Sequence, residues 1–592
     1  MIKHRVGMTL ALLLSAQTVL GLAQGATAEL ASRQAALESF LSEQWEYTLR
    51  TSPEFASIIG DKRYNDKISD FSQKAIDHEL KQNIAFLEKL ELIDTTGLSA
   101  QEQLNKELML RKLRIGIEGA KFKDWEIPVL HNSGIHINAP QMVSMFAFDT
   151  VKDYEDYIAR LAQLPKSFED TIVQMRKGMA DGLMPPKFLL PEIVRQCETI
   201  AGMKIEESPF SLPIKKFPKN FSETDKARLT AAIHAVIKDK LVPSYTAFKV
   251  FVNDEYLLKG RTEVGLWSLP DGANFYKFRV KESTTTDMTP EQIHQLGLRE
   301  VSRIEKQMLS VAQKQGYKDL KSFDESIKNN SALQPKSRQE ILDLYDKYTK
   351  QMYVQLPQLF GRLPKGKVTV MAVEEFREQG APGAAYNQGS PDGLRPGHIM
   401  VNTGDFANRS TITIESTALH EGVPGHHMQI AIAQELPELP PFRQQGNYTA
   451  YAEGWALYSE RLGEELGFYK DPYSYYGHLQ DEMLRAIRLV VDTGLHYKKW
   501  SRQQVVDFFH EHSGTSEVEV QSETDRYIVW PGQALGYKIG QLKILELRDY
   551  AQQQLGAKFD IRGFHDQVLG AGALPMDVLE RRIKTWVATQ NY

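Results

Sequence analysis

Residues 412–427 read ITIESTALHEGVPGHH, with His420 and Glu421 before a Gly-Val-Pro-Gly turn and His426 and His427 after it. A His-Glu pair followed shortly by His is the core of the helical zinc-hydrolase motif. In that motif two histidines bind the metal from one helix face and the glutamate activates a metal-bound water. Three imidazoles and one carboxylate within eight positions form a dense group in a chain that has 15 histidines among 592 residues. The segment therefore predicts a metal site.

The spacing of these histidines departs from the usual motif. In His-Glu-x-x-His the ligands stand at i and i+4, whereas His426 is at i+6 from His420 and His427 is at i+7. On an ideal helix, i+6 lies roughly 240° around the axis and i+7 lies about 10.5 Å along it. Pro424-Gly425 favours a distortion of the backbone. We predict a bulge that loops out two residues and makes His426 the second ligand, with His427 as the alternative. A Pro-Gly turn between surface histidines, without metal, is the competing interpretation.

A later helix supplies the candidate third ligand. Residues 447–462 read NYTAYAEGWALYSERL and place Glu453 among small and aromatic neighbours. Burial of a carboxylate in such surroundings is costly unless it binds a cation or a charged partner. Catalytic zinc sites use three protein ligands and leave a fourth position for water. We predict Glu453 as the third ligand. Glu460, on nearly the same helix face, is the alternative ligand or a supporting partner.

Two further segments carry candidate catalytic groups. Arg488 and His496 belong to a polar stripe with i, i+4, i+8 spacing on a helix. His496 is a candidate donor to a developing oxyanion and Arg488 a candidate substrate contact, while a salt-bridged helix face is the equal alternative. Gly536 and Gly540 permit close approach of another element. Tyr537 between them is a candidate hydrogen-bond donor to a tetrahedral intermediate.

Short strands precede the metal-binding segment. The runs 367–373 and 398–402 have strand composition, and the sequence between them is rich in turn residues. An edge strand beside a zinc helix can pair with the extended backbone of a peptide substrate. Tyr386 and Asn402 are therefore candidate substrate contacts, with a structural hairpin as the alternative.

Composition and the N-terminal residues bear on location and partners. The net charge is −5, from 71 basic and 76 acidic residues that are well mixed, so nothing favours binding to nucleic acid or an anionic membrane. Residues 1–28 combine a basic start, an apolar run and small-residue cleavage sites, which predicts a signal peptide and an exported protein, periplasmic or secreted. No cysteine lies near the cleavage region, which argues against a lipid anchor, and nothing in the mature chain resembles a membrane span. Cys197, the one cysteine, is predicted to be buried.

The rest of the chain divides at a change in composition. Residues 29–360 predict a helical lobe, and residues 361–592 predict a catalytic lobe with the small sheet and the metal-binding helices. Helical periodicity of apolar residues covers much of the first lobe. The segments with this periodicity are residues 31–49, 72–92, 153–181, 222–252, 289–315 and 338–356.

Four motifs together resemble the bacterial uncharacterised-domain family 885. They are HEGVPGHH at 420–427, YAEGWALY at 451–458, VDTGLH at 491–496 and PGQALGYKIG at 531–540. Members of this family look similar to mostly helical zinc peptidases, namely angiotensin-converting enzyme, thimet oligopeptidase and the thermostable carboxypeptidases. The resemblance covers nearly the whole mature chain. It implies a mainly α, elongated, two-lobed metallopeptidase-like fold with a small β-sheet beside a deep central groove.

The same resemblance assigns roles to individual residues. It implies that His420 and Glu453 bind the metal, that Glu421 is the general base, and that His496 and Tyr537 stabilise the oxyanion. The sequence thus predicts an exported zinc metallopeptidase that hydrolyses short peptides, with zinc preferred because the ligands are two histidines and a carboxylate. The alternatives are a metal-dependent hydrolase of a non-peptide amide or ester, and an inactive peptide-binding protein on a peptidase-like scaffold.

Overall fold

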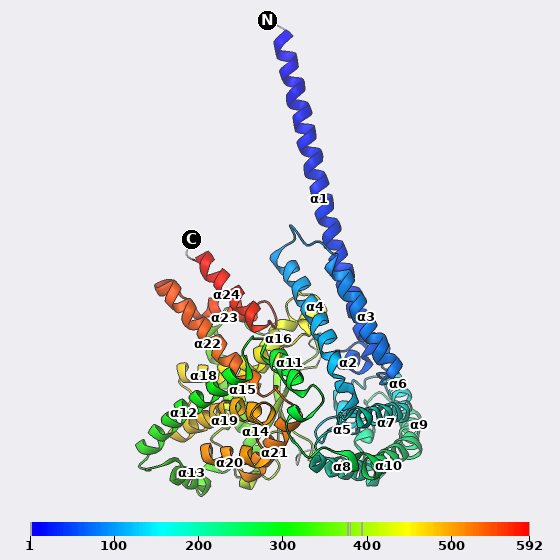
Figure 1. Ribbon diagram of the computed structural model, residues 1–592, viewed down its shortest axis with the longest axis vertical. Coiled ribbons are helices and arrows are strands. Elements are labelled where there is room, and N and C mark those ends of the chain that lie inside the picture. The colour runs from blue at the N-terminus through cyan, green and yellow to red at the C-terminus, as the bar shows by residue number, and fades with distance from the viewer. Residues whose placement is uncertain (1–2, 376–377, 379–380, 392, 394, 591–592) are drawn as a thin grey trace.

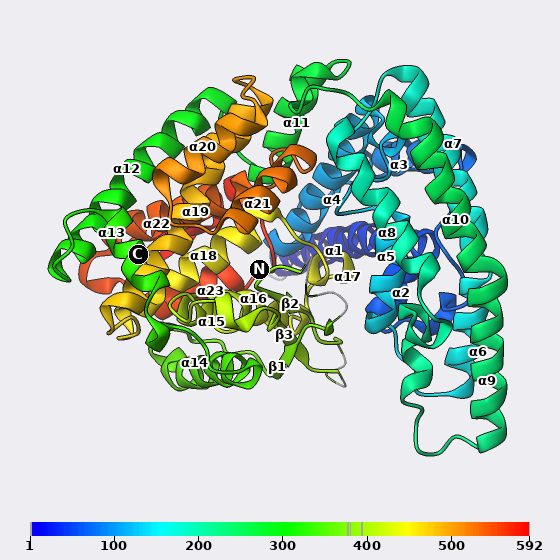
Figure 2. The same cartoon turned by 90° about the horizontal axis from the view of Figure 1, so that it is seen from below.

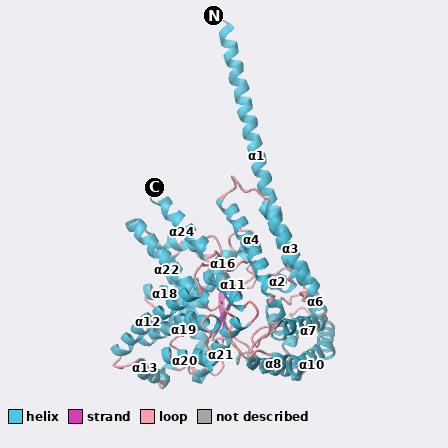
Figure 3. Cartoon of the chain, viewed as in Figure 1, coloured by secondary structure: helices cyan, strands magenta, loops and turns pink. Residues whose placement is uncertain are grey.

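The chain folds into helices around one small sheet. The computed structural model describes residues 3–375, 378, 381–391, 393 and 395–590, with side chains from residue 27 onward. Within these residues the structure is mainly helical with a single three-stranded sheet (Figure 3). Figure 2 shows two lobes, one of which contains the sheet. This architecture confirms the predicted fold class.

Within the described residues that precede the sheet, the regular elements are helices joined by loops. Local sequence sets many of their starts. For example, the Ser99 hydroxyl accepts the backbone N–H of Glu102, and the Glu102 carboxylate accepts the N–H of Ser99, which is a capping box. The α-helices are α1 (Lys3–Thr51), α2 (Pro53–Ile58), α3 (Gln73–Glu91), α4 (Ala100–Gly119), α5 (Ile135–Met142), α6 (Val151–Leu161), α7 (Leu164–Asp181), α8 (Leu190–Gly202), α9 (Glu223–Val236), α10 (Val242–Phe251), α11 (Gly272–Thr284), α12 (Pro290–Lys314), α13 (Leu320–Lys328) and α14 (Arg338–Leu359).

The sheet and a second series of helices follow. In the sheet, β3 lies between β1, to which it is parallel, and β2, to which it is antiparallel. Its inner face packs with α14 and α15 in a small cluster of buried side chains. The elements are β1 (Val368–Ala372), β2 (Ala384–Asn387), β3 (Gly397–Val401), α15 (Ile414–Glu421), α16 (His426–Gln434), α17 (Pro441–Gln444), α18 (Thr449–Glu465), α19 (Pro472–His496), α20 (Arg502–His512), α21 (Glu517–Val529), α22 (Leu535–Leu555), α23 (Ile561–Leu569) and α24 (Met576–Gln590).

Most of the predicted elements are present. Each of the six segments with helical periodicity is helical, although the segment 153–181 is divided between α6 and α7, where Pro165 stands in the first turn of α7. The strands predicted at 367–373 and 398–402 are β1 and β3. The sequence missed β2, which lies in the stretch predicted as turns. Alanine has a low strand propensity, and only pairing with β3 orders Ala384 and Ala385 as a strand.

The boundaries of the buried cores differ from the boundary at residues 360/361 that the change in composition predicts. Helices α5–α10 enclose a core of their own, which includes Tyr154, Phe168, Ile193, Cys197 and Tyr245. The burial of Cys197 is as predicted. By contrast, α12 and α14 contribute to cores that they share with helices after the sheet. The division into lobes 29–360 and 361–592 stays a prediction.

The N-terminal helix extends far beyond the rest of the molecule (Figure 1). Its last turns contribute Leu37, Phe40 and Tyr47 to the core that also contains residues of α14, α18, α22 and α24, which we call the main core. The predicted signal peptide, residues 1–28, falls in the extending part of α1 and in two residues outside the described chain, and it stays a prediction. In the described part of the chain, no helix has both the length and the apolar composition of a membrane span.

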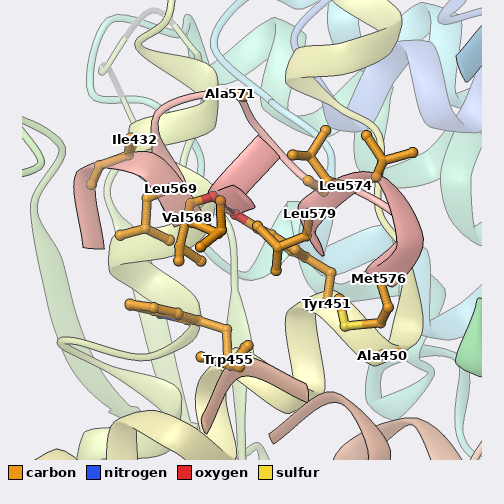
Figure 4. Close-up of a cluster of buried hydrophobic side chains, with 14 of the residues drawn as sticks. Ile432, Ala450, Tyr451, Trp455, Val568, Leu569, Ala571, Leu574, Met576 and Leu579 are labelled. Atoms are coloured by element: carbon orange, nitrogen blue, oxygen red, sulfur yellow. Dashed lines mark hydrogen bonds between the residues drawn. The ribbon is translucent and has the colours of Figure 1, made fainter. Parts of the chain in front are cut away.

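The main core supports the helix that carries Glu453. Figure 4 shows Tyr451 and Trp455 of α18 facing Val568 and Leu569 of α23. Both aromatic side chains are fully buried, and the Tyr451 hydroxyl donates to the Val568 carbonyl oxygen at 2.8 Å. Burial of a large side chain contributes roughly 1.5–3 kcal/mol. This packing holds α18 in a fixed position.

Helices α18 and α22 cross at a distance that only glycine permits. A Cβ atom on Gly540 would lie 1.8 Å from the carbonyl oxygen of Ala450, and one on Gly454 would lie 2.4 Å from Gly540 Cα. This contact confirms the prediction that the glycines of 536–540 allow close approach. The crossing brings α18, which carries Glu453, against α22, which carries Tyr537.

We expect Gly540→Ala to destabilise the protein by about 1–3 kcal/mol, because the added methyl group forces α18 and α22 apart. Gly116→Ala is the matched control, since Gly116 is in α4 and a Cβ there meets nothing within 4 Å. That change should be neutral or stabilise the helix by up to about 1 kcal/mol. Melting temperatures of the three proteins measure both effects. Equal melting of Gly540→Ala and the wild type would contradict the close crossing.

Candidate metal centre

The segment that carries the histidines is broken into two helices. Helix α15 ends at Glu421 and α16 begins at His426, with residues 422–425 as a turn between them. Gly425 is required there, because a Cβ atom would lie 1.9 Å from the carbonyl oxygen of His420. We predicted a bulge of two residues within one helix, whereas the helix ends here and a second helix begins. Proline favours this break because it has no N–H to continue the helical hydrogen bonds.

The break brings two imidazoles and a carboxylate together. The ring centroids of His420 and His426 are 4.8 Å apart. Trp455 of α18 holds the turn by donating its indole N–H to the carbonyl oxygen of Pro424 at 2.8 Å. On the same helix, Glu453 Oε2 lies 3.6 Å from His420 Nε2 and 3.3 Å from His426 Nε2. One ligand atom from each of the three residues lies within 4.8 Å of the others.

These three residues fit a divalent metal ion. Two imidazole nitrogens and one carboxylate oxygen are the ligand set of many catalytic zinc sites. Ligands bound at about 2.0–2.2 Å to a tetrahedral ion lie about 3.3–3.6 Å apart, which matches the two distances above. Moreover, Glu453 Oε2 is buried and makes no hydrogen bond within the described chain. Such an atom needs a partner, and a cation between the two imidazoles is one that the geometry allows.

Charge holds the cluster together without metal. Burial alone lowers the pKa of His420, but contacts with Glu453 and Glu460 and the charge of Glu421 raise that pKa to about 10. Burial also acts to raise the pKa of Glu453, yet His426 and His420 hold that pKa well below its usual 4.5. The Glu453 carboxylate is therefore ionised at neutral pH, as binding of a cation requires.

A second carboxylate holds His420 from the other side of its ring. His420 Nδ1 donates to Glu460 Oε1 at 2.7 Å, and Glu460 has no exposed surface. Burial acts to raise the pKa of Glu460, but Arg485, His420 and His478 lower it to about 2. Of the two roles that the sequence left open, the geometry gives Glu460 the supporting one. A hydrogen bond at Nδ1 orients an imidazole whose Nε2 faces a metal.

Glu421 lies beside this cluster with its carboxylate free. The residue ends α15, next to His420, and is 8% exposed. No hydrogen bond or ion pair to this carboxylate occurs within the described residues. Its charge contributes to the raised pKa of His420. An unpaired carboxylate at this position can act as a general base.

Tyr537 also lies against the cluster. Its ring is nearly parallel to that of His420, with centroids 6.4 Å apart and an interplanar angle of 18°. The guanidinium of Arg488 covers the Tyr537 ring at 4.6 Å, and Arg526 Nη2 is 3.4 Å from the hydroxyl. Arg488 is 4% exposed and bound to Glu523 at 2.8 Å. The structure therefore gives Arg488 a positioning role in place of the predicted substrate contact.

His427 faces away from the cluster. Its Nδ1 is hydrogen-bonded to the Tyr386 hydroxyl at 3.0 Å, and its Nε2 to the carbonyl oxygen of Gly366 at 3.1 Å. Burial lowers the pKa of His427 to about 4, so the ring is neutral at pH 7. Hence His426, and not His427, joins His420. The Tyr386 hydroxyl, a predicted substrate contact, is already used in this bond.

Two other predicted site residues have structural roles. His496 accepts the N–H of Leu266 at Nδ1, 3.0 Å, and donates from Nε2 to the carbonyl oxygen of Tyr527, 2.9 Å. Both ring nitrogens are used, which contradicts the predicted oxyanion role. Asn402 is 3% exposed and makes three side-chain hydrogen bonds to backbone groups of neighbouring loops, which contradicts the predicted substrate contact. Apart from Gly404, the partners of both residues are at least 21 residues away in sequence, so no local pattern could have revealed them.

Comparison with known proteins places most of the chain in one group. A family model described as "Bacterial protein of unknown function (DUF885)" matches residues 53–583. The crystal structure of a candidate lipoprotein from Colwellia psychrerythraea is similar over 94% of this chain and 100% of its own, with 30% identity and a TM-score of 0.89. A candidate lipoprotein of unknown function from Shewanella oneidensis shares the fold over 92% of this chain and 99% of its own, with 17% identity and a TM-score of 0.70. No curated protein matches the chain.

In the metal-free protein we expect stability to fall as the pH rises through 7 to 10. The pKa values of His420 and His478 are raised in the fold to about 10 and about 9, despite burial, chiefly by Glu453, Glu460 and Glu464. A raised histidine pKa stabilises the fold fully below about pH 6.5, and this contribution is lost as the pH passes the folded-state value.

The melting temperature, measured in chelator from pH 6 to 10, tests this expectation. Glu460→Gln should flatten the pH dependence, because it removes a charge that acts on both histidines. The same dependence in the variant and the wild type would contradict the assigned network.

Proposed function

The chain belongs to the DUF885 family of bacterial proteins, and we propose that it is an exported zinc-dependent metallopeptidase that hydrolyses short peptides. One observation carries the proposal: His420 Nε2, His426 Nε2 and Glu453 Oε2 converge, and the buried Glu453 oxygen has no hydrogen bond in the described chain. A carboxylate in that state, between two imidazoles, fits a metal ligand better than a salt-bridge partner.

His420, His426 and Glu453 would hold the metal ion, with Glu460 orienting His420. Zinc suits a set of two imidazoles and one carboxylate. When bound, a zinc ion supplies a Lewis acid that polarises a carbonyl group and lowers the pKa of water. Three protein ligands are typical of sites that act on a substrate, since a closed structural site uses four.

The residues around the cluster supply the acid–base chemistry. Glu421 has a free carboxylate, which takes the proton of the attacking water and delivers it to the leaving nitrogen. Tyr537, held by Arg488 and Arg526, directs its hydroxyl to stabilise the oxyanion. His496 has no part in this scheme, because both its ring nitrogens are bonded elsewhere.

A peptide is the substrate that the neighbouring sheet suits. Strand β2 lies at an edge of the sheet and contacts α15, the helix that ends in His420 and Glu421. An edge strand offers unpaired backbone groups to an extended chain, independent of its side chains. Export is proposed from the leader-like residues 1–28 together with the two similar solved structures, both described as candidate lipoproteins.

Metal analysis of single variants tests the proposed ligands. We expect the zinc-treated wild type to hold about one zinc ion per chain, and His420→Ala, His426→Ala and Glu453→Ala to lose it, because each removes one of three ligands. His427→Ala is the matched control and should keep its zinc. Atomic absorption or mass spectrometry of the native proteins gives the stoichiometry. A wild type without zinc would overturn the proposal.

The general base can be tested separately from the metal. We expect Glu421→Gln to keep its zinc but to hydrolyse peptides about 10²–10⁴-fold more slowly, since the amide cannot accept a proton. Digestion of a mixed library of short peptides, followed by mass spectrometry, measures the rate and the cleaved bonds. Undiminished cleavage by Glu421→Gln would exclude Glu421 as the base. Zinc-bound wild type that cleaves esters or other amides, and no peptide, would favour a different hydrolase.

A further inference from the structure

A large cavity lies between the N-terminal helices and the rest of the molecule. Its volume is about 930 Å³, which is in the range of ligand-binding pockets. Helices α1, α2 and α4 contribute one side, and α11 with the segments that precede α18 and α22 contributes another. Figure 2 shows α4 between the two lobes. None of the three candidate metal ligands lines this cavity.

The cavity nevertheless lies next to the candidate metal centre. Residues 447–449 line it and lead directly into α18. Glu453 is four residues after Thr449, which corresponds to about 6 Å along a helix. Likewise Trp530, Pro531 and Gln533 line the cavity just before α22, which carries Tyr537. The cavity lining therefore ends about one helical turn before Glu453 on α18 and before Tyr537 on α22.

The lining carries more positive than negative charge. Four cationic residues, Lys112, Arg261, Arg279 and Arg443, face two carboxylates, those of Asp124 and Glu282. Both carboxylates belong to Arg279, at 2.7 and 2.8 Å. The other cations have no carboxylate within ion-pair distance among the described residues. This surplus is notable in a chain whose net charge is −5.

Among the described residues, Lys112 is the lining cation whose charged group makes no hydrogen bond or ion pair at all. The two unpaired arginines donate to neighbouring groups, Arg443 to Asn105 and Arg261 to the carbonyl oxygen of Met184, each at 2.9 Å. The Lys112 side chain is accessible. Its ammonium has neither a hydrogen-bond nor an ion-pair partner within the described residues. Desolvation by the surrounding protein lowers its pKa, which an anion beside it would reverse.

The remaining walls are largely apolar. Aromatic side chains from both sides of the cavity contribute to them, namely Trp45, Phe55, Phe275, Phe442 and Trp530. An apolar wall beside the unpaired ammonium of Lys112 selects a ligand that combines an apolar body with an anionic group.

We infer that this cavity binds the part of the substrate away from the metal, and that this part is an apolar or aromatic residue next to a carboxylate that pairs with Lys112. The inference rests on the proposed peptidase function, because it is that function which makes the ligand a peptide. The carboxylate is either the free C-terminus of the peptide or an acidic side chain. Both present the same charge to Lys112, and the experiment separates them.

Binding of three peptides to the full-length, zinc-treated Glu421→Gln protein tests the inference by calorimetry, without interference from hydrolysis. The peptides are Ala-Ala-Phe, its C-terminal amide, and the amide of Ala-Glu-Phe. We expect the free acid to bind about tenfold more tightly than its amide, and Lys112→Gln to abolish that difference. Lys112→Arg should retain it. Lys81→Gln, an exposed change on α3 outside the cavity, is the matched control and should also retain it.

The outcomes separate this inference from the proposed function. Tight, Lys112-dependent binding of the Ala-Glu-Phe amide supports a side-chain carboxylate, and binding of the free acid alone supports the C-terminus. Equal binding of the Ala-Ala-Phe acid and its amide, together with no Lys112-dependent binding of the Ala-Glu-Phe amide, overturns the inference even where the wild type cleaves peptides. A preference that Lys112→Gln leaves intact overturns it as well. A Lys112-dependent preference in a protein whose wild type cleaves no peptide upholds the cavity as a binding site and overturns the catalytic proposal.

Discussion

The contact of one imidazole with two carboxylates of a single helix organises this molecule. His420 lies between Glu453 and Glu460, which stand two turns apart on α18 and face opposite nitrogens of its ring. This arrangement requires α15 and α18 to lie close together with their polar groups buried. Because buried charges are costly unless paired, the surrounding residues Arg485 and His478 balance Glu460. The rest of the site is built on this fixed pair of helices.

Small residues and backbone breaks make such proximity possible. Gly425 lets the chain turn back over the carbonyl oxygen of His420, so that His426 reaches the same point as Glu453. Gly454 and Gly540 let α18 and α22 cross almost in backbone contact, which sets Tyr537 against His420. Glycine at these points adds no favourable packing energy, because it has no side chain to bury. Its effect is to place donor atoms from three helices within a few ångströms.

The polar side chains near the site are of two kinds, those with hydrogen-bond partners in the protein and those without. Asn402, His427 and His496 have their side-chain donors and acceptors matched by the protein, and this rigidifies the loops around the centre. Glu421 and Lys112 stand out because no such partner exists for them in the described chain. Groups that a fold leaves free next to a cavity or a candidate metal site are those available to a ligand.

The sequence by itself determined the helical architecture, the strands β1 and β3, and His420, Glu421 and Glu453 as the chemical groups of interest. These follow from local patterns, namely apolar periodicity and a carboxylate among small and aromatic residues. Only the tertiary structure decided between His426 and His427, because that choice depends on how the 422–425 turn packs under Trp455. It also decided that His496 is structural, since its partners are 31 and 230 residues away, and that β2 is a strand, since β2 depends on pairing with β3. The cavity that Lys112 lines combines residues from 45 to 573, and no local pattern can encode a surface assembled over such separations.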